Sequence, residues 1–303
     1  MRRTHAVALA GILATGLAVS AMGPADDAYL QDLAKWRQQR ETDLKGDNSW
    51  LTVAGLFFLN EGRNTFGSAP TNDIVLPPDA PPEAGAIEYD GTRVTLRAAQ
   101  PLTVNGAPVT TAELRPPGDG KPADQVKIGA LTFFVHKSGD RVAIRLRDLN
   151  SEIRRGFTGL KWFAPNEAYR VVGRFEPYAQ AKPMKVPNVL GDFETYTAPG
   201  VVSFTLNGEP LKLEVFDAGS GENRRFFIVF RDLTSGKETY ASARFLYAPR
   251  PNAKGEVELD FNKAYNPPCA FNPYTTCPLP VPMNRLRVRI EAGELDYHKS
   301  ATH

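Results

Sequence analysis

The amino-terminal part of the chain carries a helical pattern of hydrophobic and charged positions. Between residues 25 and 44 large side chains recur at steps of three and four, and the positions between them are mostly charged. This period places the recurring side chains on one face of an α-helix. They are Leu30, Leu33, Trp36, Arg40 and Leu44. The pattern predicts a helix over 25–44 that packs as a strap on the main body of the protein.

From residue 50 onward the pattern changes to short runs of β-branched and aromatic residues. Asn105-Gly106 and Asn207-Gly208 separate such runs, and this dipeptide is typical of tight hairpin turns. No long helical pattern lies between the runs, which argues against an α/β fold. We therefore predict an all-β protein with one N-terminal helix, in which an antiparallel sandwich is followed by an antiparallel roll or barrel. The predicted strands cover 51–59, 92–98, 131–137, 141–147, 169–175, 201–206, 211–216, 226–231, 238–247, 257–261 and 285–290.

The chain divides near residues 148–155, where compact hairpin patterns give way to an irregular, aromatic-rich segment. We expect a leader, a helix, a sandwich and a roll, in that order. Their expected ranges are 1–21, 22–47, 48–148 and 149–303, and the roll includes a proline-rich, cysteine-containing loop at 260–284.

The first residues have the pattern of a secretory signal peptide. Arg2 and Arg3 precede an uncharged apolar run over 6–21, and Val19-Ser20-Ala21 has the small residues of a cleavage site. The run is shorter than the roughly 20 residues needed to span a bilayer. We expect cleavage after Ala21, a periplasmic or secreted mature protein, and no membrane span after cleavage.

The charge balance argues against a nucleic-acid partner. The 303 residues include 36 Lys and Arg and 34 Asp and Glu, and the leader removes two Arg and no acid, so 34 of each sign remain. A nucleic-acid binder needs a basic face that displaces counterions. We expect no nucleic-acid partner.

Histidine is scarce, which excludes several kinds of catalytic site. Of 4 histidines, His5 lies in the leader and His298 and His303 lie near the C-terminus, which leaves His136. A Ser-His-Asp triad needs a well-placed histidine, and catalytic zinc usually needs two or three. The sequence also lacks a GxSxG elbow, an HExxH helix, a phosphate-binding loop and a dinucleotide fingerprint. We expect no cofactor and no metal.

The loop at 260–284 combines polar, aromatic and proline residues. A proline-rich loop loses little freedom on ordering, so it can hold side chains in fixed directions. Such a loop caps a sheet or lines a cavity, and both alternatives stay open here. Its candidate ligand-binding residues are Asp260, Asn262, Tyr265 and Asn266. Cys269 and Cys277 are expected to form a disulfide, because the chain is expected to be exported.

Two further groups of residues suit ligand binding. Arg147 and Trp162 belong to a constellation of cations and aromatic rings that fits a carboxylate or sugar acid. Strand alternation over 238–247 places Tyr240 and Arg244 on one face, where they would point into a cavity. The alternative in each case is that these side chains only form ion pairs or packing contacts within the fold and bind no ligand.

The first half resembles the forkhead-associated (FHA) β-sandwich family. The matching strings are LNEG at 59–62, NTFG at 64–67, NDIVLP at 72–77, VNG at 104–106 and VKIG at 126–129. The phosphothreonine-reading residues of that family are replaced here by Gly67-Ser68 and the proline-rich stretch 77–82. The resemblance implies an FHA-like fold without the family's phosphate grip.

The chain also resembles the bacterial domain-of-unknown-function family 1684, over nearly the whole mature chain. The segments that carry this resemblance are 149–163, 230–236, 238–240, 244–247, 260–272 and 277–280. The family brings no established activity, so the resemblance leaves the chemistry open.

The leading functional hypothesis is a non-catalytic module that binds a small polar or anionic ligand, or a protein partner, between the roll and its proline-rich loop. The rival hypothesis is a hydrolase or lyase in which Asp260 works with Glu238 or Asp232 as acid and base. A third is a purely structural envelope protein. Whether the protein is an enzyme stays open.

Overall fold

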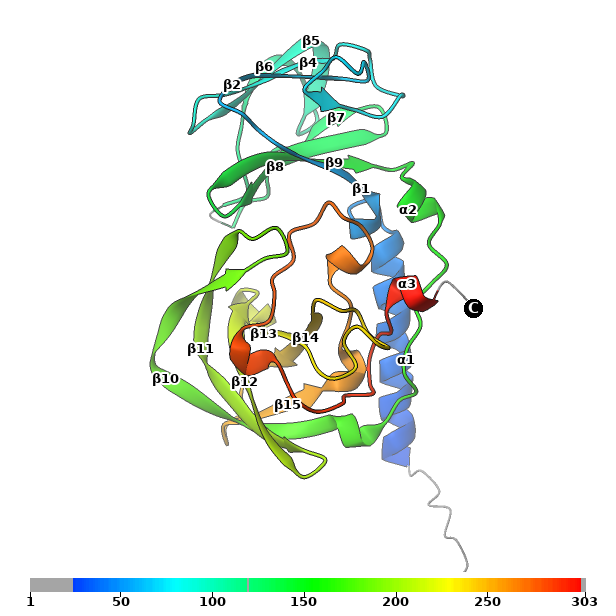
Figure 1. Ribbon diagram of the computed structural model, residues 1–303, viewed down its shortest axis with the longest axis vertical. Helices are drawn as coiled ribbons and strands as arrows, with labels where there is room; N and C mark the ends of the chain where they lie inside the picture. Colours follow the sequence, from blue (N-terminus) through cyan, green and yellow to red (C-terminus); the bar gives the residue numbers. More distant parts are fainter. Residues whose placement is uncertain (1–23, 119, 301–303) are drawn as a thin grey trace, which may run out of the picture.

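The protein consists of two β lobes and a long helix that runs along the second lobe. The computed structural model describes residues 24–118 and 120–300, and Figure 1 shows the lobes stacked end to end with helix α1 (Pro24–Lys45) beside the second. The predicted leader, 1–21, lies outside the described residues. The prediction of a mostly β protein with one N-terminal helix is confirmed.

The first lobe is a nine-stranded, barrel-like sheet with the order β1-β9-β8-β7-β5-β4-β2-β3, to which β6 is added beside β5. All pairings are antiparallel except the short β2–β3 pair. Alternate side chains of the strands fill one core, which includes Phe66, Leu96, Phe133 and Ile144. The strands are β1 (Val53–Phe58), β2 (Gly62–Gly67), β3 (Ile74–Val75), β4 (Gly85–Tyr89), β5 (Val94–Val104), β6 (Ala107–Leu114), β7 (Val126–Ile128), β8 (Leu131–Ser138) and β9 (Arg141–Asp148).

The second lobe is a six-stranded antiparallel sheet with the order β14-β13-β12-β11-β10-β15, curved until it nearly closes. One face of the sheet buries a core that includes Phe204, Phe226 and Phe230. The other face packs on the proline-rich loop through Phe227, Phe245 and neighbouring apolar side chains. The strands are β10 (Arg170–Pro187), β11 (Phe193–Leu206), β12 (Glu209–Ala218), β13 (Arg225–Phe230), β14 (Arg244–Pro249) and β15 (Glu256–Asp260).

Short helical turns occupy the connections. They are η1 (Trp50–Thr52), α2 (Glu152–Arg155), η2 (Glu167–Tyr169), η3 (Gly221–Asn223), η4 (Phe261–Lys263), η5 (Pro268–Ala270), η6 (Pro282–Asn284) and α3 (Tyr297–Ser300). Three of them, η4 to η6, lie in the proline-rich region that crosses the second lobe (Figure 1).

The Asn-Gly dipeptides form the turns expected of them. Asn105 and Asn207 have φ of 49° and 52°, and the glycine that follows each also has positive φ. This left-handed pair is the geometry of a type I′ turn, which joins β5 to β6 and β11 to β12. Asparagine and glycine tolerate this region better than other residues, so the sequence itself sets these hairpins.

One predicted strand, 238–247, is correct only from Arg244 onward, and another, 285–290, is wrong. Residues 231–243 form a turn-rich loop and β14 begins only at Arg244, so Tyr240 and Arg244 do not share a strand face. Residues 285–290 contain no strand. The carboxylate of buried Asp232 links the two segments: it accepts the backbone N–H of Ile290 at 2.6 Å and the side-chain hydroxyl of Thr234 at 2.7 Å.

Helix α1 lies on the second lobe through a mixed polar and apolar face. Leu33 and Leu44 are buried, as the helical pattern predicts. Trp36 meets Trp162 edge to face at 5.6 Å between ring centroids, and Arg40 donates to Glu294 at 2.7 Å. The helix therefore joins the start of the chain to segments near its end.

Candidate functional site

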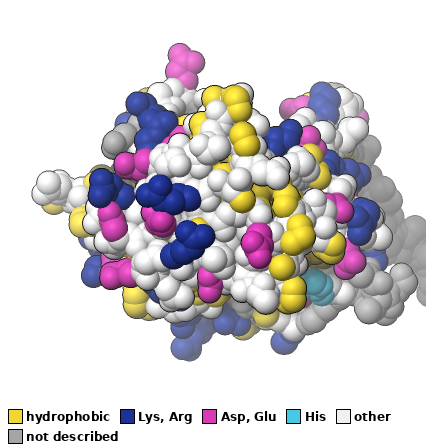
Figure 2. Space-filling view, turned by 90° about the horizontal axis from the view of Figure 1, so that it is seen from above, with side chains coloured by type: hydrophobic (Ala, Val, Ile, Leu, Met, Phe, Trp, Pro, Cys, Tyr) yellow, Lys and Arg dark blue, Asp and Glu magenta, His cyan; other side chains and the backbone are white. Residues whose placement is uncertain are grey.

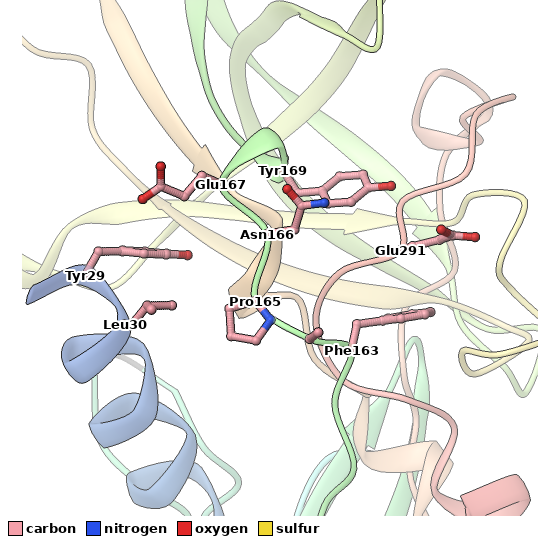
Figure 3. A pocket seen from close by; sticks show the side chains of 9 residues that line it. Tyr29, Leu30, Phe163, Pro165, Asn166, Glu167, Tyr169 and Glu291 are labelled. Carbon is pink, nitrogen blue, oxygen red and sulfur yellow. The ribbon is translucent and has the colours of Figure 1, made fainter. Parts of the chain in front are cut away.

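A pocket of about 480 Å³ opens between the start of helix α1, the segment 163–169 and Glu291. Figure 3 shows Tyr29 and Leu30 projecting from the first turns of α1 toward that segment, with Glu291 on the opposite side. The lining residues are Tyr29, Leu30, Phe163, Ala164, Pro165, Asn166, Glu167, Tyr169 and Glu291. Apolar rings and side chains make the walls, and a few phenol, amide and carboxylate groups supply the polarity.

A buried, hydrogen-bonded carboxylate, that of Asp260, lies behind the pocket. Tyr29 donates its hydroxyl to Oδ1 of Asp260 at 2.9 Å, and the backbone N–H of Asn262 donates to the same oxygen at 3.2 Å. Nζ of Lys263 lies 3.3 Å from Oδ2 of Asp260, whose residue is only 6% exposed. Burial and the Asp260 charge raise the pKa of Tyr29 well above its ordinary value, so the phenol stays protonated and donates.

Asn262 holds the wall of the pocket in place. It is fully buried, and its side-chain amide makes two hydrogen bonds of 2.9 Å with the backbone N–H and C=O of Asn166. Asn166 in turn caps η2 by accepting the N–H of Ala168 at 2.9 Å. The predicted site residues Asp260 and Asn262 therefore shape this pocket from behind, and they are not among the residues that line it.

The charges on the lining are acidic. Of the nine described residues that line the pocket, Glu167 and Glu291 are ionisable as acids and none is Lys or Arg. Figure 3 shows the two carboxylates at opposite ends, with Asn166 and Tyr169 between them. Glu291 pairs with Arg289 at 2.8 Å.

Cations surround the pocket without entering its lining. Arg37 donates to the carbonyl of Phe163 at 3.2 Å, and Arg170 lies over the ring of Tyr29 at 4.9 Å while it pairs with Glu258 at 2.7 Å. Hydrogen bonding to Glu258 raises the pKa of Arg170, whereas burial lowers that of Arg37.

Tyr265 and Asn266 belong to a second cluster under the middle of α1. The guanidinium of Arg40 lies 4.3 Å from the Tyr265 ring, donates to the carbonyl of Asn266 at 3.0 Å and pairs with Glu294. Burial raises the pKa of both Tyr265 and Glu294. Oδ1 of Asn266 and Oε1 of Glu294 are buried without a hydrogen-bond partner in the described part of the chain. This cluster fastens the helix.

The remaining predicted ligand-binding residues are spread over the molecule. Arg244 is 1% exposed and binds Asp232 and the carbonyls of Ile290 and Ala292, so it is held within the fold of the second lobe. Trp162 packs on α1, and Arg147 lies on β9 of the first lobe. The structure therefore does not bring these eight residues together at one place, because their partners lie in different parts of the fold.

Tyr240 lines a smaller pocket beside the disulfide. Its hydroxyl donates to the carbonyl of Cys269 at 3.1 Å, and the pocket of about 380 Å³ also includes Asn272 and His298. Cys269 and Cys277 form the expected disulfide, which closes the proline-rich loop.

Sequence reasoning missed Tyr29, Glu291 and Glu294. None of them belongs to a motif, and Tyr29 lies 231 residues from its partner Asp260. The available signal was a tyrosine one position before the predicted helical stripe, on the same face as Leu33.

The described residues contain neither a cluster of metal-ligating side chains nor a helix that could span a membrane. Within 24–118 and 120–300, no group of three or more His, Cys, Asp or Glu side chains is arranged to hold a metal ion. Among these same residues, no helix has the length and apolar character needed to cross a membrane.

The second half of the chain is similar to a protein family of unknown function. Residues 155–295 match the model described as a protein of unknown function, DUF1684. The match begins after the first lobe, so it is narrower than the nearly whole mature chain expected from the motifs. No curated protein matches the chain.

Two solved structures are similar to part of the chain. An uncharacterized protein of Haloarcula marismortui, solved by solution NMR, is 33% identical, covers 47% of this chain and 78% of its own, and has a TM-score of 0.40. The FhaA FHA domain, crystallised with the intracellular domain of Rv3910, is 23% identical, covers 30% of this chain and 97% of its own, and has a TM-score of 0.21. These scores are too low to establish a shared fold, so the FHA-like character of 48–148 stays a prediction.

Proposed function

We propose that this is an exported, non-catalytic binding protein that holds a small polar ligand in the pocket at the start of α1. The observation that carries the proposal is the pocket itself, whose volume of about 480 Å³ lies within the roughly 300–1,000 Å³ of small-molecule sites. Apolar walls with a few fixed polar groups are typical of such sites. A purely structural protein has no need of such a pocket.

The lining favours a neutral or cationic ligand over an anionic one. Glu167 repels anions, Glu291 is already paired with Arg289, and Arg170 is paired with Glu258. Phe163 and Leu30 provide apolar surface for the body of the ligand. We therefore propose a hydroxyl-rich or amine-bearing compound with an apolar portion.

The carboxylate-based hydrolase or lyase is disfavoured because each proposed acid has its own structural partners. Asp232 is bound by Arg244 and by the N–H of Ile290, and Glu238 pairs with Arg289 at 2.8 Å, which holds the pKa of Glu238 below its usual value. Asp260 accepts a hydrogen bond from the hydroxyl of Tyr29. Acid–base catalysis needs two carboxyl groups that face one reacting bond.

Export is supported by the leader pattern and by the disulfide, which persists in oxidising compartments. The full-length chain expressed in its own host should yield a mature protein beginning at Met22. A protein that keeps residues 1–21 and stays in the cytoplasm would contradict export.

Calorimetric titration with choline and with glucose tests the binding proposal. We expect at least one probe to bind, and Glu167→Gln to weaken choline binding about tenfold through loss of the charge, which corresponds to about 1.4 kcal/mol. Glu222→Gln, an exposed substitution outside the pocket lining, is the matched control and should leave binding unchanged.

Two results together would reject the site. One is that neither probe binds, or that binding is the same in Glu167→Gln and Glu222→Gln. The other is that protein purified from its own cells releases no small molecule in native mass spectrometry.

A further inference from the structure

The outer face of β9 carries three arginines at the junction of the two lobes. Strand alternation turns Val142, Ile144 and Leu146 into the core of the first lobe. The intervening positions Arg141, Arg145 and Arg147 lie on the opposite face. That face meets the second lobe, because Arg141 binds Asp192 and Arg145 donates to Thr276.

These arginines differ in their counter-charges. Arg141 makes a two-pronged contact with Asp192, at 3.0 Å from Nε and 2.6 Å from the terminal nitrogen. For Arg145 and Arg147, no carboxylate of the described residues lies within 4.0 Å. The fold therefore leaves two neighbouring guanidinium groups without an acid.

Arg145 is the more deeply buried of the two. It is 4% exposed, and its terminal nitrogen donates to Nε2 of His136 at 2.9 Å and to the hydroxyl of Thr276 at 3.3 Å. Burial, and then the charge of Arg147, lower the pKa of Arg145 to about 10, while the more distant Glu194 acts in the opposite direction. Arg145 therefore keeps its charge at neutral pH.

Arg147 is half-buried beside it. Its closest described polar contact is a long one, 3.4 Å to the side-chain oxygen of Asn48. Nε of Arg145 and Nε of Arg147 are both buried without a hydrogen-bond partner in the part of the chain that the structure describes. Such donors normally have partners, because a buried unsatisfied polar group is costly.

The surroundings are aromatic and neutral. The Arg147 guanidinium lies 5.0 Å from the ring of Phe134, and that of Arg145 lies 5.6 Å from the ring of Trp50. Trp50 itself is 38% exposed. Burial lowers the pKa of His136 to about 4, so this neighbour is neutral at pH 7 and accepts the hydrogen bond from Arg145.

We propose that Arg145 and Arg147 form a second ligand site, which binds an oxyanion group, a carboxylate or a phosphate, of a small molecule at the lobe junction. A buried charge costs several kcal/mol unless it is paired, and two like charges on adjacent positions of one face add to this cost. Guanidinium forks match the two oxygens of a carboxylate or phosphate. The site is separate from the acidic pocket at α1 and does not depend on its function.

The test is thermal unfolding of the full mature protein at pH 7.5 with increasing inorganic phosphate or succinate, with ionic strength held constant by NaCl. Either anion should raise the wild-type midpoint by roughly 3 °C along a saturable curve. Arg147→Gln should shift the half-saturating concentration at least tenfold or abolish the rise. Arg141→Gln, on the same strand face, is the matched control: loss of its link to Asp192 lowers the midpoint without anion, but the rise with anion should equal that of the wild type.

The two anions distinguish the source of the oxyanion. A response to phosphate alone assigns a phosphorylated ligand, and a response to succinate alone assigns a carboxylic acid. Trp50 fluorescence should follow the same saturation curve, and Trp50→Phe should remove that signal.

The proposal is overturned if the wild type shows no saturable response to either anion. It is equally overturned if Arg147→Gln and Arg141→Gln respond alike, because that result marks a general salt effect. Arg145→Met serves as a second variant: it removes the buried charge, so it should fold and lose the response.

Discussion

Individual carboxylates and arginines under α1 and at the lobe junction differ mainly in how completely they are paired. Asp260 accepts a phenol O–H and a backbone N–H on Oδ1, whereas its Oδ2 has the ammonium group of Lys263 at 3.3 Å and no hydrogen-bond partner in the described part of the chain. Glu294 has Arg40 on one oxygen and no described partner on the other, and burial raises its pKa. Satisfied groups hold the fold in place, whereas incompletely satisfied ones mark where protons or ligands act.

His136 should make the stability of the protein depend on pH. Its pKa in the folded protein is lowered to about 4 by burial and by Arg145, against about 6.5 for an ordinary histidine. Below pH 6.5 the unfolded chain therefore binds more protons than the folded one, so stability falls as the pH is lowered from about 6.5 to 4. The contribution is at most about 3 kcal/mol.

The measurement is urea unfolding of wild type and His136→Gln at pH 7.5 and pH 4.5. The variant should lose less stability between these two pH values than the wild type does. An equal loss in both proteins would show that other groups cause the acid sensitivity.

Only some of the residues that form the α1 pocket could be predicted from the sequence. Asp260 and Asn262 were found because they lie in an unusual polar segment, and both do shape a pocket. Tyr29 and Glu291 were not found, because their role depends on contacts between distant parts of the chain. Whether any of these residues binds a ligand stays a prediction.

Among the elements, α1 is the one whose attachment depends most on polar contacts. Tyr29, Arg37 and Arg40 each bind a residue of the second lobe or its preceding segment, and Glu41 accepts the N–H of Leu160 at 2.9 Å. The helical period in the sequence predicted which face is buried. It did not reveal that an arginine on this face meets a buried glutamate.

Arg40→Met should destabilise the protein by about 3–5 kcal/mol, because it leaves the carboxylate of Glu294 buried without its cation. The double variant Arg40→Met/Glu294→Gln should recover part of this loss, since no charge then remains. Lys35→Met, which removes an exposed pair with Asp32, should change stability by less than about 1 kcal/mol. Urea unfolding measures all three, and a double variant no more stable than Arg40→Met would contradict the buried-charge explanation.

Strands were predicted well where a hairpin turn or clean alternation marks them, as in β8, β9, β12 and β13. The failures at 238–243 and 285–290 have local causes. The backbone N–H groups of Glu238 and Thr239 donate to the carbonyl of Thr234 in a turn, and the N–H of Ile290 donates to the buried carboxylate of Asp232. Such side-chain to backbone pairing between distant segments leaves no periodic trace.

The whole molecule is held together by contacts between the lobes as well as by the helix. The turn between β10 and β11 brings Asp192 and Asn188 to the end of β8, where Ser138 donates to Asp192 at 2.6 Å and accepts from Asn188 at 3.0 Å. On the other side of the junction, Asn272 of the proline-rich loop donates to the carbonyl of Trp50 at 2.6 Å. Charges of both signs are interspersed on the first-lobe end of the molecule (Figure 2), so that end presents no broad basic surface.

Asp192→Asn should weaken the coupling of the two lobes. The substitution removes the charge that Arg141 and Ser138 both bind, and Arg141 would then lack an acid, as its neighbours on β9 already do. We expect calorimetry to show the first lobe unfolding separately, at a midpoint a few degrees below that of the second lobe, and trypsin to cut faster in the connecting segment 149–169. Asp140→Asn, an exposed neighbour in the same groove, is the control and should unfold like the wild type. If Asp192→Asn also unfolds in one transition at the wild-type midpoint, then the apolar and proline-loop contacts alone couple the lobes, and the polar link at the β10–β11 turn contributes only to their orientation.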